Sequence, residues 1–294
     1  MNERNIVVLG KFDGVHLGHT RLLEKANQIS REHSMPVVVY VISFKKDEVI
    51  TDDNEKENIL RGLGADEVIF RTIDDEFKNM MPYEFVQNIV HTGLKAGFVI
   101  VGENFRFGKG RCGDVDTLSE MCSRIGMECV VVDTVRRLSP KGIKEVVSST
   151  AIREYIAMGQ VDIAGQYLGR AYSIKGVVTG GKHLGGKMGC PTANVYPPQN
   201  SLEMKNGVYA SEIIIDGASY KSITNVGCNP TVEEGKRVIT ETHILNGSMD
   251  CYGKTAEIRF IKFIRPEIRF ENQDKLYKQI EADICYVKKL WGLP

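Results

Sequence analysis

The sequence of 294 residues has no excess of either charge, since 38 lysines and arginines balance 38 aspartates and glutamates. General binders of nucleic acid or of anionic membranes need a basic surplus, so this balance argues against both partners. Apolar runs of membrane-spanning length are also absent, and VVVYVI at 37–42 has the length of a buried strand. The N-terminal stretch MNERNIVVLG has too few apolar residues for a signal peptide. We therefore expect a cytoplasmic protein whose partners are small molecules.

Cysteine pairs of the kind that bind zinc are missing. The seven cysteines are odd in number and include no Cys-x-x-Cys pair, and their neighbours are mostly apolar or neutral. This pattern argues against a disulfide framework and against a zinc site, and it predicts reduced thiols.

The first half of the chain, up to about residue 158, alternates short apolar runs with helical patterns. Continuous Val/Ile runs separated by helices indicate a parallel sheet that is covered on both faces, so we expect a doubly wound, Rossmann-like α/β domain. Its first helix is expected over about 18–33, with one apolar face made by Leu22, Leu23, Ala26 and Ile29. The expected strands are 5–10, 37–42, 67–70, 98–102 and 128–133.

The second half, after the segment 169–181, is rich in β-branched residues and in turn signals such as Asp216-Gly217. Several strands with short connections predict a small antiparallel β-barrel. A closing helix is expected from the apolar stripe of Leu276, Ile280, Ile284, Val287 and Leu290. We expect domains at 1–160 and 168–294, with a boundary near 159–170, where the sequence is neither strand-like nor strongly apolar.

The stretch GKFDGVHLGH lies where the first strand leads into the first helix. Helix N-termini at the carboxyl ends of parallel strands attract anions, and Gly10, Gly14 and Gly18 would let the backbone approach a phosphate closely. His16 and His19 are three residues apart, so both rings can face one side and stabilise charge on a leaving pyrophosphate. The alternative is that one histidine caps the helix and the other is incidental.

A further stretch has the residue types of a phosphate site. Ser148, Ser149 and Thr150 supply hydroxyls at the start of a helix, and Arg153, one turn later, would face the same anion. Helix capping alone is the alternative for these hydroxyls. Asn104 follows the strand at 98–102, within GENFRFG, whose alternating aromatic residues could equally be divided between core and surface.

The second half has no P-loop motif, which at first argues against another phosphoryl-transfer site. It does contain the glycine-rich stretch GGKHLGGKMGCPTANV, whose backbone could close over phosphates, although such a stretch is more often only a turn. In an extended segment Thr192 and Asn194 project to one side and offer oxygen ligands suited to Mg²⁺. Glu241 is expected on a strand with a partly apolar face, where a salt bridge to lysine or arginine is the alternative to a chemical role.

The pattern Gly-x-His-x-Gly-His at 14–19 resembles the signature of nucleotidylyltransferases. Together with VGENFRFGKGRCGD and VSSTAIREYI, it is similar to the adenylyltransferase half of the prokaryotic bifunctional riboflavin kinase/FMN adenylyltransferases. The stretches GCPTAN, NGVYA, NVGCNPTV, ETHIL and YGKTAEIRFIKFIRPEIRF resemble successive blocks of the riboflavin kinase domain of that family.

The resemblance implies that the barrel phosphorylates riboflavin with ATP to FMN, and that the first domain adenylylates FMN to FAD with release of pyrophosphate. It implies Mg²⁺ at both steps, held in the barrel by Thr192 and Asn194. The implied catalytic residues are His16, His19, Arg153 and Glu241, of which Glu241 is the base for the ribityl hydroxyl. The implied binding residues are Gly10, Phe12, Asp13, Gly14, Gly18, Asn104, Ser148, Ser149, Thr150, Gly180, Lys182, Gly189, Pro191, Asn225 and Arg265.

The sequence departs from the family at three places. The stretch ISFKKDEVIT at 42–51 has no proline, Gly186 stands where arginine or lysine is usual, and Pro266 replaces an acidic residue. These departures leave open two alternatives: an FMN adenylyltransferase with a weak or inactive kinase barrel, and a flavin-binding regulator without turnover. The oligomeric state is also left open.

Overall fold

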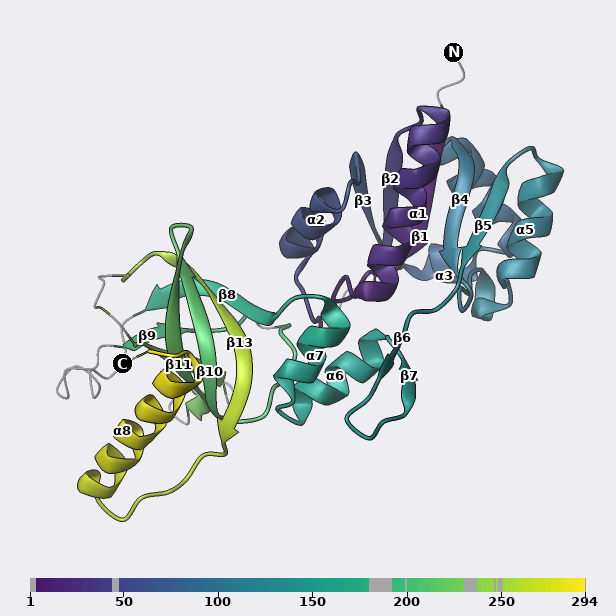
Figure 1. Ribbon diagram of the computed structural model, residues 1–294. Helices are drawn as coiled ribbons and strands as arrows, with labels where there is room; N and C mark the ends of the chain where they lie inside the picture. Colours follow the sequence, from purple (N-terminus) through teal and green to yellow (C-terminus); the bar gives the residue numbers. More distant parts are fainter. Residues whose placement is uncertain are drawn as a thin grey trace. The chain divides into compact units, whose positions relative to one another are not determined.

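The computed structural model describes residues 4–43, 48–179, 192–198, 200–229, 237–245, 247 and 251–293. The chain divides into two compact units, Met1–Ser149 and Thr150–Pro294 (Figure 1). No described helix combines the length and the apolar character that crossing a membrane requires. The five cysteines whose side chains are described, Cys112, Cys122, Cys129, Cys251 and Cys285, are free thiols.

The first unit is built on a five-stranded parallel sheet of order β3-β2-β1-β4-β5. All five expected strands are confirmed, with small differences at their ends. The strands are β1 (Asn5–Gly10), β2 (Val37–Ser43), β3 (Glu67–Thr72), β4 (Ala96–Gly102) and β5 (Glu128–Val132). The helical elements are α1 (Leu17–His33), α2 (Asp53–Gly62), α3 (Asp75–Asn79), α4 (Pro82–Glu84), the π-helix η1 (Phe85–Gly93), the short turn η2 (Lys109–Arg111) and α5 (Val115–Arg124).

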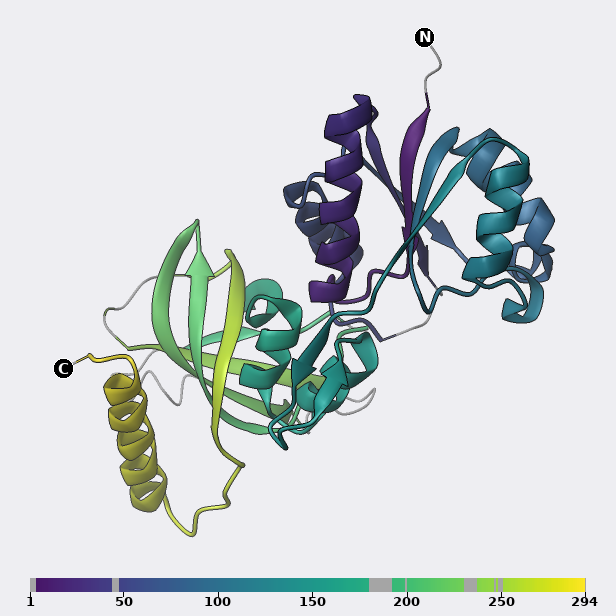
Figure 2. The ribbon, with the colours of Figure 1, turned by 45° about the vertical axis from the view of Figure 1, so that its right-hand side comes forward.

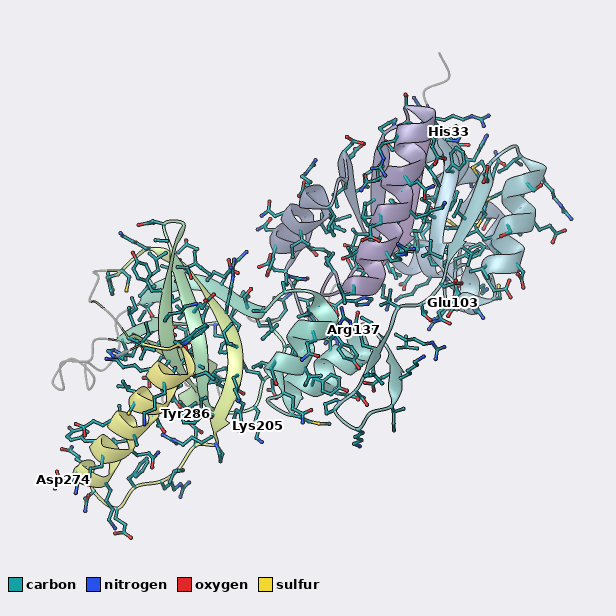
Figure 3. The ribbon with its side chains drawn as sticks, viewed as in Figure 1. His33, Glu103, Arg137, Lys205, Asp274 and Tyr286 are labelled. Carbon is teal, nitrogen blue, oxygen red and sulfur yellow. The ribbon has the colours of Figure 1, made fainter. Side chains whose placement is uncertain are left out.

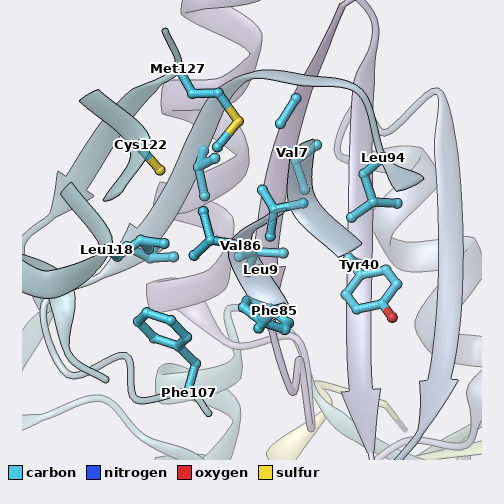
Figure 4. Close-up of a cluster of buried hydrophobic side chains, with 14 of the residues drawn as sticks. Val7, Leu9, Tyr40, Phe85, Val86, Leu94, Phe107, Leu118, Cys122 and Met127 are labelled. Atoms are coloured by element: carbon cyan, nitrogen blue, oxygen red, sulfur yellow. The ribbon is translucent and has the colours of Figure 1, made fainter. Parts of the chain in front are cut away.

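The sheet is covered on both faces, as the doubly wound prediction requires. Alternate residues of β1 enter two separate hydrophobic clusters because successive side chains of a strand point to opposite faces. Val7 packs with η1 and α5, part of which is seen in Figure 4, whereas Ile6 and Val8 pack with α1 and α2. Figure 2 shows α1 and α5 on opposite sides of the sheet. The predicted apolar face of α1 is the buried one: Leu22, Leu23, Ala26 and Ile29.

The segment 159–170, which we expected to be neither strand-like nor strongly apolar, is partly helical. It contains helix α7 (Val161–Leu168), and four of its side chains are buried. Their spacing of one turn places them on a single face, which the glycines at 159, 165 and 169 obscure in the sequence. The buried residues are Val161, Ala164, Tyr167 and Leu168. The short hairpin of β6 (Arg136–Leu138) and β7 (Lys144–Val146) and the helix α6 (Ser149–Ala157) precede it.

The second unit contains a closed six-stranded barrel of order β10-β11-β12-β9-β8-β13, in which neighbouring strands are antiparallel. The predicted turn at Asp216-Gly217 joins β10 to β11, and both residues have positive φ, 51° and 80°. The strands are β8 (Tyr172–Thr179), β9 (Thr192–Val195), β10 (Gly207–Ile215), β11 (Ala218–Asn229), β12 (Arg237–Ile244) and β13 (Thr255–Arg265).

The barrel interior holds a chain of four fully buried hydroxyl groups. Ser211 Oγ lies 2.8 Å from Ser222 Oγ and 2.7 Å from Thr224 Oγ1, which in turn lies 2.8 Å from Thr242 Oγ1. Buried hydroxyls are tolerated when they are hydrogen-bonded to one another. The chain therefore connects β10, β11 and β12 across the interior.

Helix α8 (Gln273–Leu290) closes the second unit by packing on the outer face of β10 and β11. Val287 and Ile284 contact Val208 and Ala210 in this cluster. The last residue of the predicted stripe, Leu290, is 41% exposed, because the helix ends there and turns away at Trp291. Figure 3 labels Asp274 and Tyr286, which mark the first turn and the exposed side of this helix.

Candidate active sites

The histidine motif lies at the carboxyl edge of the parallel sheet, between β1 and α1. From β1 the chain proceeds outward through β2 and β3 and then returns to the other side of β1 with β4. The strand order reverses at this point, which is where open α/β sheets form a crevice for ligands. Asn104, exposed just beyond the end of β4, lies at the same edge.

Both histidines cap the N-terminus of α1. His16 Nδ1 accepts a hydrogen bond from the backbone N–H of Gly18 at 3.1 Å, and His19 Nδ1 accepts one from the backbone N–H of His16 at 3.2 Å. The two rings are stacked, with centroids 3.8 Å apart. The alternative, in which one histidine caps the helix and the other is incidental, does not describe this arrangement, because both imidazoles take part in the cap; their role at a phosphate stays a prediction.

These bonds determine where the histidines carry their protons. A backbone N–H can only donate, so each Nδ1 must be the unprotonated acceptor and each neutral ring carries its proton on Nε2. His16 is nearly buried, and His19 is partly buried. Burial, together with His16 and Lys56 nearby, holds the pKa of His19 well below its ordinary value. The pair therefore offers two neutral Nε2–H donors.

The residues around the pair shape the loop. Phe12 (φ 51°), Gly14 (φ 79°) and Val15 (φ 40°) all adopt left-handed backbone conformations, which fold the chain tightly before the helix. Phe12 is fully buried, and its ring centroid lies 4.9 Å from that of His19, so the phenyl ring packs against the imidazole. A Cβ on Gly18 would lie 3.0 Å from the His16 ring, and glycine there makes room for the cap.

Two other predicted residues hold the loop in place. Asp13 accepts a hydrogen bond from the Ile50 N–H through Oδ1 at 2.9 Å, and its carbonyl accepts one from Ser149 Oγ at 2.8 Å. Ser149 is therefore next to the histidine loop, and its role as a phosphate ligand stays a prediction. Thr150 and Arg153 lie in α6 within the second unit, and their roles stay predictions, as does that of Ser148.

Sequence reasoning missed a polar segment that the Asp13 bond attaches to this loop. Thr51 is buried, and its hydroxyl has no hydrogen-bond partner among the described residues. Lys56, on α2, is almost completely buried. Lys56 lies four residues before the buried Leu60 and therefore on the apolar face of α2. A lysine on an apolar helix face is the feature by which the sequence could have identified this residue.

A second polar site is built by the ladder of the barrel. Asn225 of β11 lies opposite Glu241 of β12, Glu241 lies opposite Asn194 of β9, and Asn194 lies opposite Thr179 of β8. Directly opposed residues project to the same face, so this row places a carboxylate between two amides. The row faces away from the interior hydroxyls of Thr224 and Thr242, which alternate with it. Thr179 was not predicted and is identified only by the register.

The oxygen ligands predicted for Mg²⁺ fit this row. Asn194 is 3% exposed, and its Oδ1 has no hydrogen-bond partner among the described residues, so a buried acceptor is available. Thr192, two residues earlier on β9, is exposed and projects to the same face. Amide and hydroxyl oxygens are the hard ligands that Mg²⁺ takes. The donor set is therefore compatible with the ion and with a phosphate bound to it.

Glu241 and Arg265 differ in their ion-pair partners. Glu241 is exposed, and no described lysine or arginine forms an ion pair with it. Arg265, by contrast, makes three contacts of 2.7–3.0 Å with the carboxylate of Asp283 on α8. That pairing gives Arg265 a structural partner on the helix. Gly180, Lys182, Gly189 and Pro191 lie outside the described residues, as does Gly186.

Comparison with known proteins matches both halves of the chain. A family model described as FAD synthetase matches residues 1–151, and one described as riboflavin kinase matches residues 168–291. The bifunctional riboflavin kinase/FMN adenylyltransferase of Escherichia coli (strain K12) is 32% identical over 99% of this chain and 94% of its own length. That of Buchnera aphidicola subsp. Schizaphis graminum (strain Sg) is 30% identical over 100% and 96%. A crystal structure of a macrolide-efflux protein from Streptococcus pneumoniae has a TM-score of 0.85, with 27% identity over 96% of this chain and 93% of that one.

Proposed function

Because the chain belongs to the family of bifunctional riboflavin kinase/FMN adenylyltransferases, we propose a division of its two reactions between the sites described above. The enzyme phosphorylates riboflavin to FMN with ATP and adenylylates FMN to FAD. We assign the first reaction to the barrel within 168–294 and the second to the histidine motif of the domain at 1–160. Both reactions use small-molecule substrates, and we propose that they take place in the cytoplasm.

The capped histidine pair is the observation that best supports adenylyl transfer in the first domain. A phosphate oxygen of FMN attacks the α-phosphorus of ATP, and the bond to the pyrophosphate breaks. The Nε2–H groups of His16 and His19 donate to the phosphate oxygens on which negative charge grows. Since each Nδ1 is engaged with the backbone, the pair stabilises charge without transferring a proton. Gly10, Gly14, Gly18, Asp13 and Asn104 are assigned to the walls of this site, with Ser148, Ser149, Thr150 and Arg153 as further phosphate ligands.

Phosphorylation of riboflavin is assigned to the polar row of the barrel. The terminal ribityl hydroxyl attacks the γ-phosphorus of ATP, Glu241 accepts the proton of that hydroxyl, and ADP leaves. Asn225 and Asn194 flank the carboxylate and can orient the substrates. Thr192 and Asn194 would hold Mg²⁺, which when bound screens the charge of the triphosphate. Gly180, Lys182, Gly189, Pro191 and Arg265 remain proposed nucleotide contacts.

The test uses the full-length enzyme with riboflavin, ATP and Mg²⁺, followed by separation of the fluorescent flavins. Glu241→Gln should reduce FMN formation by about 10²–10⁴-fold and leave FAD formation from supplied FMN unchanged. The double variant His16→Gln/His19→Gln should reduce FAD formation by about 10²–10³-fold and leave FMN formation unchanged.

Two matched variants control for general effects. His33→Gln changes a histidine at the other end of α1, and Glu212→Gln changes a carboxylate on β10, two strands away from β12 in the barrel, that pairs with Lys221. Both should retain both activities. A reversed pattern, in which Glu241→Gln blocks FAD formation or the histidine variant blocks FMN formation, would refute the assignment of sites.

A further inference from the structure

The connection between β13 and α8 lies against the barrel at two positions that have no side chain. A Cβ on Gly207 of β10 would overlap the Arg265 carbonyl oxygen, and a Cβ on Gly227 of β11 would lie 2.6 Å from Glu267 Oε1. Contacts this short leave no room for a side chain. The Arg265 guanidinium, which α8 holds in place, also donates to the Pro266 carbonyl at 2.9 Å. The fold therefore fixes this connection on two neighbouring strands.

Glu267 brings a second carboxylate to the polar row of the barrel. Gly227 is buried and lies two residues after Asn225 on β11, so both residues belong to the same face of the strand. The Asn225 Nδ2 lies 3.6 Å from the point where a Gly227 Cβ would be, which is the same point that Glu267 Oε1 approaches. The other carboxylate oxygen, Oε2, accepts a hydrogen bond from Asn206 Nδ2 at 3.3 Å. The carboxylate is thus held at the Asn225 end of the row, and Glu241 lies on the next strand.

The two ends of the row suit different substrates. Asn194 and Thr192, at one end, offer neutral oxygen atoms to a cation and its phosphates. At the other end the carboxylate of Glu267 repels a triphosphate, since like charges disfavour each other. Neighbouring strands are about 4.8 Å apart, so the two ends are separated by roughly 10 Å, with Glu241 between them. ATP is therefore expected at the Asn194 end, and the alcohol that it phosphorylates at the Asn225 end.

We propose that Glu267 binds the ribityl chain of riboflavin by accepting hydrogen bonds from its hydroxyl groups. This inference rests on the proposed function, in which Glu241 takes the proton of the terminal hydroxyl. An ionised carboxylate only accepts hydrogen bonds, and bonds to a charged acceptor are stronger than neutral ones. Riboflavin is uncharged and its side chain carries several hydroxyl donors, so it fits this acceptor. Bonds to Glu267 then keep the terminal hydroxyl beside Glu241.

A purely structural role for Glu267 makes a different prediction. If its carboxylate only bonds to Asn206, replacing it affects every flavin substrate alike. The comparison uses a flavin analogue with a hydroxypentyl side chain, which keeps the terminal hydroxyl of riboflavin and lacks the others. Glu267→Met keeps the length of the side chain and removes the acceptor, and Glu267→Gln keeps a neutral acceptor. Glu271→Met is the matched control, because Glu271 is an exposed carboxylate of the same connection that pairs with Lys275.

The experiment measures FMN formation by the full-length enzyme with Mg²⁺, and the concentrations of riboflavin, the analogue and ATP are varied in turn. Glu267→Met should lower kcat/KM for riboflavin about tenfold, Glu267→Gln should lower it less, and the KM for ATP should stay unchanged. For the analogue, kcat/KM of the unmodified enzyme should already be about tenfold lower, and Glu267→Met should lower it no further. Glu271→Met should behave like the unmodified enzyme with both flavins.

Several outcomes would overturn the inference. An equal fall in kcat/KM for riboflavin and for the analogue would leave only a structural role, and a raised KM for ATP would place Glu267 at the nucleotide end. Should Glu267→Met fail to fold, the unmodified enzyme still decides, because equal kcat/KM values for riboflavin and the analogue contradict the proposal. If instead Glu241→Gln retains full FMN formation, the proposed function of the row fails, and this result is distinct from a failure of the Glu267 inference. FAD formation from supplied FMN is the internal measure of an intact fold.

Discussion

Replacing Asp283 by asparagine should destabilise the barrel strongly, because it leaves the Arg265 guanidinium buried without its counter-charge. The two side chains are 6% and 16% exposed and make three contacts of 2.7–3.0 Å. Asparagine has nearly the same shape but carries no charge. Removing one partner of a buried pair costs about 3–5 kcal/mol. We take the lower end of that range because Arg265 is partly accessible to water, and expect about 3 kcal/mol.

The assay uses the single tryptophan of the chain. Trp291 follows α8 directly, packs into the cluster between that helix and the barrel, and lies with its ring centroid 3.7 Å from Lys221 Nζ. Its fluorescence therefore reports on the contact that Asp283→Asn weakens. A loss of about 3 kcal/mol corresponds to a fall of roughly 10 °C in the midpoint of thermal unfolding for a unit of this size. The double variant Arg265→Met/Asp283→Leu should recover most of the stability, since a well-packed apolar pair can replace a buried ion pair.

The same variants separate this structural role from the nucleotide contact proposed for Arg265. If the guanidinium serves the barrel through Asp283, the double variant retains riboflavin phosphorylation at 25 °C with a similar KM for ATP. An unchanged unfolding midpoint in Asp283→Asn would refute the reasoning. A raised KM for ATP in Arg265→Met that the double variant fails to correct would instead restore the nucleotide-binding role.

Two further predictions concern stability. The pKa of native His19 lies well below its ordinary value of 6.5, so as the pH falls through 6.5 the unfolded chain binds a proton that the native chain does not. The first unit should therefore lose stability from pH 7.5 to 5.5. In thermal unfolding, His19→Gln should reduce that loss. A loss that is identical in the variant would contradict this origin. Thr224→Val removes the hydroxyl that joins Ser211 to Thr242, and in urea unfolding it should lower the free energy of unfolding by about 1–3 kcal/mol. The control Thr255→Val, at the exposed start of β13, should lower it by under about 0.5 kcal/mol. Equal losses in the two threonine variants would show that the interior chain adds nothing.

The first unit follows from its sequence because its patterns are local. The strand VVVYVI and the one-sided helix that begins after His16 depend on residue spacing within a few turns, and both are found as predicted. Helix α7 was missed because Gly165 interrupts its short apolar face and two further glycines, Gly159 and Gly169, flank the helix. The histidine motif was identified by residue types, but its reciprocal cap requires ring orientations that spacing does not determine.

The arrangement of the barrel site depends on contacts between distant segments, which sequence reasoning could not supply. Glu241 and Asn194 are 47 residues apart in the numbering and meet only through the register of β12 and β9. Thr179 joins that row through β8, and no local pattern distinguishes it from other strand threonines. Tertiary pairing thus supplies what periodicity cannot.

The reciprocal cap of α1 uses the same two imidazoles that we propose to bind phosphate. On that proposal, an anionic phosphate oxygen that accepts from Nε2–H makes the ring richer in electrons and strengthens Nδ1 as an acceptor, so phosphate binding and the first turn of the helix are coupled through the imidazoles. Any change that loosens this turn also misaligns the donors. We therefore expect any variant that relaxes the beginning of α1 to bind nucleotide more weakly.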